Sequence, residues 1–299
     1  MQSDKSDENM KKPLYNFSEV KYNEPIKTNR KEMNVMKKFI ALFLALILCM
    51  SCFAACGEKE EKTVVVGYTI YEPMNYKDAS GKLVGFDTEL AEAVFAKLGY
   101  KVVFQEIKWE SKYTDVNSGA IDCIWNGFTA NSKDDDGIAR ADKVDFSYNY
   151  MKNQQVVVVK KDSGIKTAED LKGKMGAVEA GSAGESYAKD AYKEAIIKGF
   201  SVQTECLREV KAGTQQFAVL DEQLAKSYCG KGDYADLEIV EGLSSDPEFY
   251  AIGFKKGSEL TAKVNAQLEA LAKDGTIKTL AEKYGVATTA ITDFSDQKK

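Results

Sequence analysis

The run NQQVVVVKK, from Asn153 to Lys161, decides how this 299-residue chain is expected to fold. Four consecutive valines between polar residues are typical of a buried β-strand. The run follows a long connection, and a second series of strands and helices starts from it. We therefore predict an α/β protein whose chain passes here from one series of elements to another.

The first series lies upstream of this run. The stretch TVVVGYTI (63–70) has the β-branched composition of a buried strand, and the Ser-Gly pair at 80–81 is expected to turn a hairpin. A helix is predicted over Asp87–Tyr100, with Asp87 as its N-cap and Gly99 as its stop. Further strands are expected in KVVFQEI and AIDCIWNG, with a short helix between them. This alternation indicates a layered α/β sheet.

The second series continues the alternation downstream. A helix is predicted over Gly184–Ile197, and VKAGTQQFAVLDEQLAKSY has the order helix, strand, helix. The stretches DLEIVEGL and FYAIGFKK are predicted strands, and the latter must cross back to the first series. One or two helices are expected over Ser258–Gly285, with an apolar stripe made of Leu260, Val264, Leu268 and Leu271.

The composition excludes several classes of function. The chain has 41 Lys and Arg against 46 Asp and Glu, so it offers no broad basic surface for nucleic acid. It has no histidine, and so it lacks the commonest general base, the commonest metal ligand and any Ser-His or Cys-His pair. An enzyme is therefore possible but has few catalytic groups left, and we expect a protein with no metal, no cofactor and no enzymatic activity.

The N-terminal region is expected to be an export signal. Two lysines precede FIALFLALILCM (39–50), an apolar run of 12 residues that suits a signal-peptide core better than a membrane span. The following SCFAACGEKEEK resembles a bacterial lipobox with Cys56 as the lipid-modified residue. The alternative is an ordinary signal cut after Ala55. In both cases the chain is exported, and the lipobox implies anchoring on the outer face of the membrane.

We predict three segments before the folded part of the chain. Residues 1–35 are a mis-assigned start or a disordered extension, since a complete signal starts at Met36. Residues 36–56 form the signal, and residues 57–62 form a charged tether. Residues 289–299 are expected to be a tail. The true start, Met1 or Met36, stays open.

The cysteines outside the signal are Cys123, Cys206 and Cys229, without metal-like spacing. Cys123 lies in an apolar strand pattern and is expected in the core. Whether Cys206 and Cys229 pair is left open.

Six segments resemble, in order, the amino-acid-binding proteins of ABC transporters, the polar amino-acid (family 3) extracellular solute-binding proteins. They are GKLVGFDTELAEAV, NSGAIDCIWNGFT, VDFSYNYMKNQQVVVVKK, KTAEDLKGKMGAVEAGS, AVLDEQLAKSY and AKDGTIKTLAEKYG. The resemblance implies a two-lobe fold like that of type II periplasmic binding proteins. It also implies a monomer that captures a free amino acid between the lobes and delivers it to a membrane permease.

The resemblance also implies where the lobes divide. Two crossover strands are expected near Gln154–Val159 and Glu248–Ile252. The first lobe would then comprise residues 63–153 plus 253–288, and the second residues 154–252.

A cleft for an amino acid needs a cation for the carboxylate of the ligand, because a buried charge without a partner is costly. ARADKVDFS resembles the family pattern of an Arg five residues before Asp-Phe-Ser, which implies Arg140 as this cation. Counting forward from Gly127 favours Lys133 instead, unless about six residues around KDDDGI are inserted.

Thr129 is either a second carboxylate contact or a turn residue that bonds its own backbone, and Ser182 is a helix N-cap, an anion contact or both.

The cleft also needs a carboxylate for the ammonium of the ligand. The resemblance implies Asp221, whose alternative is a plain N-cap. Aromatic walls are expected from Tyr71, Trp109 and Phe128, with Gly127 beside them. The remaining candidates are less defined: Trp125 belongs to the core or the site, and Glu72 and Glu110 are more typical of solvated surface.

Two other functions remain possible on this fold. Dehydratase-like and cell-wall lytic enzymes carry similar lobes, with Glu72, Glu110 or Glu179 as a candidate acid. A ligand-sensing domain is the other alternative. The sequence leaves open which amino acid is bound.

Overall fold

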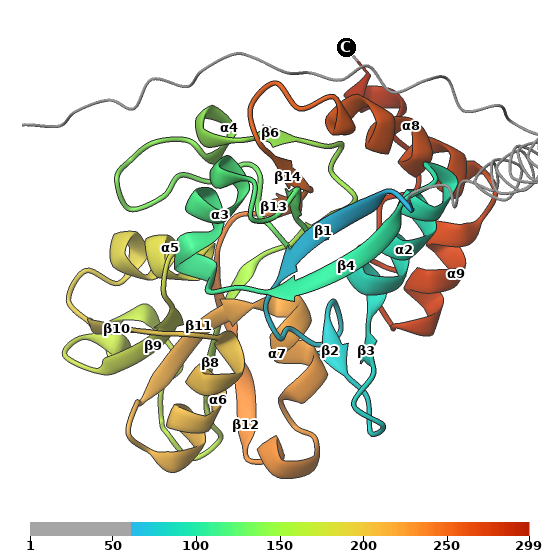
Figure 1. The fold of residues 1–299 in the computed structure, drawn as a ribbon. Coiled ribbons are helices and arrows are strands. Elements are labelled where there is room, and N and C mark those ends of the chain that lie inside the picture. The colour runs from blue at the N-terminus through green and yellow to red at the C-terminus, as the bar shows by residue number, and fades with distance from the viewer. Residues whose placement is uncertain (1–60, 299) are drawn as a thin grey trace, which may run out of the picture. The chain divides into compact units, whose positions relative to one another are not determined.

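The computed structural model describes residues 61–298, so the predicted signal, the extension before it and most of the tether lie outside the described residues. Residues from 61 onward form one compact unit. This unit contains two five-stranded mixed sheets, each flanked by helices, and each sheet forms the centre of one lobe (Figure 1). The α/β, two-lobe fold predicted from the sequence is therefore confirmed.

The first sheet has the strand order β4-β1-β5-β14-β6. β4 and β5 run parallel to β1 on either side, and β14 is antiparallel to β5 and β6. The strands are β1 (Thr63–Tyr68), β4 (Lys101–Glu106), β5 (Cys123–Ile124), β6 (Asp145–Phe146) and β14 (Gly253–Phe254). The helices of this lobe are α2 (Phe86–Lys97), α3 (Lys112–Ser118), α4 (Arg140–Lys143), α8 (Leu260–Lys273) and α9 (Thr276–Lys283), with short 3₁₀ turns at η1 (Trp109–Ser111) and η4 (Ser295–Gln297).

The chain between β1 and α2 forms the predicted hairpin, in which β2 (Tyr76–Lys77) pairs with β3 (Leu83–Val84). Gly99 ends α2 in the left-handed region at φ 76°, as predicted. The expected N-cap role of Asp87 is wrong. Gly85 occupies the cap position, and the buried Asp87 carboxylate accepts hydrogen bonds at 2.8 Å from both the backbone N–H of Gly127 and the hydroxyl of Tyr150.

The C-terminal helical segment contains two helices, because Gly275 turns the chain in the left-handed region at φ 83° between α8 and α9. Val264, Leu268 and Leu271 are buried and Leu260 packs against the same core, which confirms the predicted stripe.

The second sheet has the strand order β10-β9-β11-β8-β12. β8 is antiparallel to both neighbours, and its four valines are buried, as expected for a central strand covered on both faces. The strands are β8 (Gln155–Lys160), β9 (Met175–Glu179), β10 (Ile196–Phe200), β11 (Phe217–Asp221) and β12 (Leu237–Ser244). The helices are α5 (Ala183–Ala191), α6 (Gln203–Ala212) and α7 (Glu222–Tyr228), with 3₁₀ turns at η2 (Ala168–Leu171) and η3 (Gly232–Tyr234).

The helix predicted over Gly184–Ile197 is too long. α5 ends at Ala191, and the β-branched pair Ile196 and Ile197 begins β10, which pairs with β9. Pairing with a neighbouring strand satisfies the backbone there better than one more helical turn of β-branched residues.

Two paired strands connect the lobes. β7 (Met151–Asn153) lies between β6 and β8 in the chain, and β13 (Glu248–Tyr250) lies between β12 and β14. They pair antiparallel, with Asn153 opposite Glu248 and Met151 opposite Tyr250. We call β7 and β13 the linking ribbon. The second crossover falls where it was expected, but the first precedes Gln154–Val159, because that valine run is buried within the second sheet.

The three cysteines within the described residues are free thiols. Cys123 belongs to the core of the first lobe, as predicted, and Cys206 and Cys229 do not pair.

Candidate functional site

A small cavity of about 10 Å³ lies between the lobes. Its walls form where β1, β5, β9 and β11 end, the edge at which open α/β sheets bind ligands. Seven of the eight predicted ligand-binding residues line it, and Phe128 does not. The lining from the first lobe is Tyr71, Trp109, Asn126, Gly127, Thr129 and Arg140, and from the second Glu179, Ser182, Ala183, Gln203 and Asp221. We call this space the interlobe cavity.

Arg140 is the cation of this cavity. It begins α4, and its side chain is 1% exposed. Its Nε donates to Asp134 at 2.8 Å, and its two Nη atoms donate at 3.3 Å to the carbonyl oxygens of Thr129 and Gly181. A guanidinium has five N–H donors, so two Nη–H groups stay without a recorded partner among residues 61–298. Arg140 can therefore hold a planar carboxylate with both of its oxygens.

The loop before Arg140 explains the uncertain spacing in the sequence. Asp134 to Ile138 forms a turn closed by a hydrogen bond of 3.1 Å between the backbone N–H of Asp134 and the carbonyl of Ile138. The Asp134 carboxylate forms ion pairs with Arg140 and Lys143. Burial raises the pKa of Asp134, but the charge of Arg140 and the other groups around Asp134 outweigh burial and lower this pKa to about 2. Lys133 lies exposed outside the cavity lining. The loop thus directs Arg140, and not Lys133, into the cavity.

The Phe128 ring packs against the Arg140 guanidinium group. Its ring centre lies 5.2 Å from the Arg140 Cζ, and the ring packs edge-on against Trp109 at 5.3 Å. Phe128 therefore packs against two of the lining residues, and the ligand contact predicted for it stays a prediction.

A second buried cation, Lys112, was missed by sequence reasoning. Its Nζ donates to the Gly181 carbonyl at 2.9 Å and lies 4.6 Å from the centre of the Tyr113 ring. Burial, and then the nearby charge of Arg140, lowers the pKa of Lys112 to about 7. Nothing in the sequence distinguishes it from the surface lysines of a short helix. Lys112 and Arg140 both donate from the first lobe to one carbonyl of the second.

Ser182 lies at the cavity mouth as the N-cap of α5. Its Oγ accepts a hydrogen bond of 3.0 Å from the backbone N–H of Glu185. The N–H groups of the first helical turn, at Ala183 and Gly184, have no partners within the helix and lie beside the cavity. The cap and the predicted anion contact are therefore compatible.

Asp221 is the carboxylate at the end of β11. It occupies the N-cap position of α7, but its side chain makes no cap bond, so a plain capping role is wrong. Its oxygens accept hydrogen bonds from Asn153 at 2.8 Å, from Gln155 at 2.6 Å and from Gln203. All three donors are neutral amides, and burial raises the pKa of Asp221 above its usual value. The group is held in place without a cation.

Glu248 lies on the linking ribbon and accepts hydrogen bonds from two of the amides that also donate to Asp221. Its Oε1 accepts from Asn153 at 2.6 Å, from Gln155 at 2.8 Å and from the Thr129 hydroxyl at 3.0 Å. Burial, and then the charge of Asp221, raises the pKa of Glu248 to about 7. The Thr129 hydroxyl thus bonds Glu248 and not its own backbone, while its predicted contact with the ligand carboxylate stays a prediction.

Tyr71 and Trp109 supply the aromatic wall. Tyr71 is oriented by a hydrogen bond of 2.6 Å between its hydroxyl and that of Tyr250. Gly127 has φ 56°, and a Cβ there would lie 2.6 Å from the Tyr71 ring. Glycine at this position therefore lets the loop after β5 approach the wall.

The remaining candidates lie outside the cavity lining. Trp125 is fully buried in the core of the first lobe, Glu72 is half-buried and Glu110 is exposed. Asn126 and Gln203 line the cavity but were not predicted; each is a polar residue beside an apolar strand or helix face. Asn126 bonds Thr69 and Asn75, and so it fixes the loop on which Gly127 lies.

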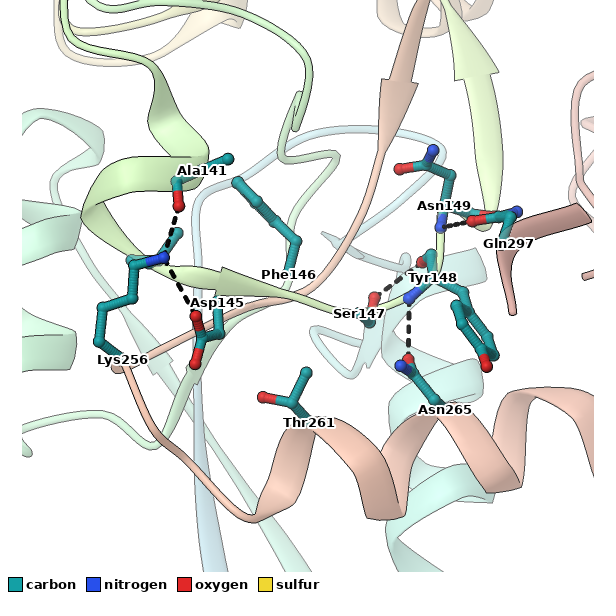
Figure 2. Close-up of a pocket in the computed structure, with 11 residues that line it drawn as sticks. Ala141, Asp145, Phe146, Ser147, Tyr148, Asn149, Lys256, Thr261, Asn265 and Gln297 are labelled. Atoms are coloured by element: carbon teal, nitrogen blue, oxygen red, sulfur yellow. Dashed lines mark hydrogen bonds and ion pairs between the residues drawn. The ribbon is translucent and has the colours of Figure 1, made fainter. Parts of the chain in front are cut away.

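A larger pocket of about 610 Å³ lies on the first lobe between β6 and α8 (Figure 2). Its charged residues already neutralise each other, since Lys256 Nζ lies 3.1 Å from Asp145. Its amides bind the backbone, with Asn265 accepting from Tyr148 N–H at 2.8 Å and Gln297 from Asn149 N–H at 2.6 Å (Figure 2). This pocket offers no separated pair of opposite charges, whereas the interlobe cavity does.

Two α/β lobes, a linking ribbon and a charged cavity between the lobes define an extracellular solute-binding protein with a type II periplasmic-binding-protein fold. The chain belongs to the bacterial extracellular solute-binding proteins, family 3, whose family model matches residues 64–287.

Individual proteins give the same result. The chain is 30% identical to the arginine-binding extracellular protein ArtP of Bacillus subtilis, over 83% of this chain and 98% of that protein. It is similar to the structure of an ancestral arginine-binding protein bound to arginine, with 38% identity, a TM-score of 0.66 and coverage of 74% of this chain and 97% of that one. A histidine-bound substrate-binding protein of an ABC uptake transporter from Streptococcus pneumoniae is similar at 33% identity and a TM-score of 0.66, with 74% and 92% covered.

Proposed function

We propose that a free amino acid binds in the interlobe cavity as a zwitterion, with its carboxylate on Arg140 and its ammonium on Asp221. One observation carries the proposal: a buried cation and a buried carboxylate line the same cavity from opposite lobes. Burying either charge of an amino acid without a partner is costly. Such a cavity therefore favours a molecule that carries both charges on neighbouring atoms.

The other lining residues fit this orientation. The Ser182 hydroxyl and the first N–H groups of α5 add donors for the carboxylate. Tyr71 and Trp109 offer apolar faces to the ligand side chain. Gly127 and Thr129 line the cavity beside them on the first lobe.

The protein is the amino-acid-binding component of an ABC uptake transporter, as predicted from the sequence. Its relatives are binding proteins and not enzymes, which confirms the expected absence of enzymatic activity. It acts outside the cytoplasmic membrane, in the extracellular or periplasmic space.

Delivery to the permease follows from closure in this proposal. Contacts from Arg140 to the Gly181 carbonyl and from Asp135 to Ser186 join the two lobes. A ligand that touches both lobes shifts the population toward the closed form, which we propose docks as a monomer on the membrane permease.

We further propose that Cys56 carries a lipid anchor. Cys56 lies outside the described residues, so this proposal rests on the lipobox-like sequence alone. Across residues 61–298, the helices are all too short or too polar to traverse a bilayer. An anchor at Cys56 would hold the folded part at the membrane through the short charged tether.

A thermal-shift panel of the twenty amino acids plus cystine tests the proposed function. A ligand present at about 100 times its Kd stabilises the folded state by about 2.7 kcal/mol, which gives a clear rise in melting temperature. At least one free amino acid is expected to produce this rise. If all of them leave the melting temperature unchanged, the proposed site is wrong.

A further inference from the structure

The carboxyl group of Glu179 lies in the interlobe cavity without a complete set of partners. Glu179 is the last residue of β9, its side chain lines the cavity, and the residue is 4% exposed. Its Oε1 is buried and has no hydrogen-bond partner among the described residues. Burial, and then the charge of Asp221, raises the pKa of Glu179 to about 8. A buried carboxyl oxygen without a partner is costly, so it requires an explanation.

The neighbouring carboxyls differ from Glu179 in this respect. Asp221 and Glu248 share the amide donors of Asn153 and Gln155. The Glu179 Oε1 receives no such donor, although the Gln203 amide lies close enough to the carboxyl group to oppose the rise of its pKa. Glu179 and Asp221 are the last residues of the neighbouring parallel strands β9 and β11, both line the cavity, and the charge of Asp221 acts on Glu179.

The cations around the cavity do not balance these carboxyls. Within residues 61–298, none of Asp221, Glu179 and Glu248 takes part in an ion pair. Arg140 is already paired with Asp134, and the Lys112 ammonium donates to two backbone carbonyls. A zwitterionic ligand brings one ammonium, which Asp221 is proposed to bind. The charges of Lys112 and Arg140 act on the Glu179 carboxyl from a distance, but among the described residues no ion pair or hydrogen bond joins either cation to it.

From this geometry we infer that Glu179 binds a cationic group on the ligand side chain, so that the cavity selects an amino acid with an ammonium or guanidinium side chain. This inference rests on the proposed function, because it assumes that Asp221 holds the α-ammonium. The aromatic faces of Tyr71 and Trp109 suit the methylenes between the two positive groups, and they also attract a cation.

Isothermal titration with two pairs of near-isosteric ligands tests the inference. Arginine is compared with citrulline, whose ureido group is neutral, and lysine with norleucine, whose side chain ends in a methyl group. For the wild-type protein we expect at least one cationic ligand to bind about tenfold or more tighter than its neutral partner, equivalent to about 1.4 kcal/mol. Equal binding within both pairs, or tighter binding of the neutral ligand in both, overturns the inference.

The substitution Glu179→Gln keeps the size of the side chain and removes its ability to become negatively charged when a cationic ligand binds. We expect it to reduce the ratio between the cationic and the neutral ligand by about tenfold, with the melting temperature of the ligand-free protein checked to confirm folding. Glu110→Gln is the matched control, because Glu110 is an exposed glutamate outside the cavity lining, and it should keep the wild-type ratio. An unchanged ratio in Glu179→Gln overturns the inference.

The two proposals fail in different ways. If a neutral amino acid binds tightly and the cationic ones do not, the role of Glu179 is wrong while the zwitterion site stands. If no amino acid binds the wild-type protein at all, the proposed function itself is wrong, and the role of Glu179 falls with it.

Discussion

Asn153 and Glu248 face each other across the linking ribbon, and the Asn153 side-chain amide donates to the Glu248 carboxyl at 2.6 Å. The same nitrogen donates to Asp221 at 2.8 Å. One amide therefore connects the strands between the lobes with the carboxylate proposed to bind the ligand ammonium. A change of charge at Asp221 acts directly on the groups that hold the ribbon together.

Asp221→Asn is expected to weaken binding of the cognate amino acid by about 30-fold or more, since an unpaired buried ammonium costs about 2–5 kcal/mol. Isothermal titration measures the loss. Asp233→Asn, an exposed position on the same lobe, serves as the control and should bind like the wild type. A Kd for Asp221→Asn within twofold of the wild-type value contradicts the assignment.

Arg140→Lys keeps a positive charge but loses the planar fork that can hold both carboxylate oxygens. We expect the affinity to fall by about tenfold or more, which corresponds to about 1.4 kcal/mol. The companion variant Lys133→Met should change the affinity by less than about twofold, because Lys133 is exposed and lies outside the cavity lining. The reverse pattern would show that Lys133 is the ligand cation.

The stability of the ligand-free protein should fall as the pH rises from 5 toward 7. Burial raises the pKa of Glu248 from 4.5 to about 7, so in this range the folded protein keeps a proton that the unfolded chain has released. The unfolded state then binds fewer protons, and each such group lowers the free energy of unfolding by at most about 1.4 kcal/mol per pH unit. Asp87 and Glu179 act in the same direction.

Melting curves of the wild type and of Glu248→Gln at pH 5, 6 and 7 measure this effect. Glutamine can still accept the bonds from Thr129, Asn153 and Gln155 through its carbonyl oxygen. The variant should therefore lose stability less steeply with pH. Parallel curves would mean that Glu248 is ionised throughout this range.

Gly127→Ala is expected to destabilise the protein more than Gly137→Ala. Both glycines have positive φ, 56° and 77°, so both variants bear the backbone strain of about 1 kcal/mol. Only at Gly127 does the added Cβ meet another residue, the Tyr71 ring at 2.6 Å. Urea unfolding gives the two free energies, and equal losses would show that the loop moves away from Tyr71 freely.

Cys56→Ser is expected to move the protein from the membrane fraction to the medium or periplasm and to abolish labelling by a radioactive fatty acid. Stable anchoring through lipid chains depends on the modified cysteine. Cys52→Ser, a cysteine four residues earlier in the same segment, is the control and should stay labelled. Release of the wild-type protein without any label would support the ordinary signal cut after Ala55.

Much of the cavity could be predicted because its residues follow strand ends. Ser182 and Asp221 lie where β9 and β11 of the second sheet end, Arg140 lies in the connection after β5 of the first sheet, and the resemblance of those segments supplied their roles. The insertion expected around KDDDGI obscured only the spacing. Its turn closes on itself, so the added residues do not displace Arg140.

The residues that were missed carry no local sign of burial. Lys112 begins a short polar helix, and only the rings of Trp109 and Tyr113 around its ammonium show that it points inward. Glu248 was expected only as part of a crossover strand. Its link to Asp221 depends on a pairing between segments 95 residues apart, and no period in the sequence encodes such a pairing.

The linking ribbon gives both halves of the protein one common pivot. Because Asn153 of β7 donates both to Asp221 and to Glu248 of β13, one side chain joins the proposed ligand-binding carboxylate to the strands that connect the lobes. Selection for another solute would therefore alter how fast the halves open and shut, and the rate of uptake would evolve together with specificity.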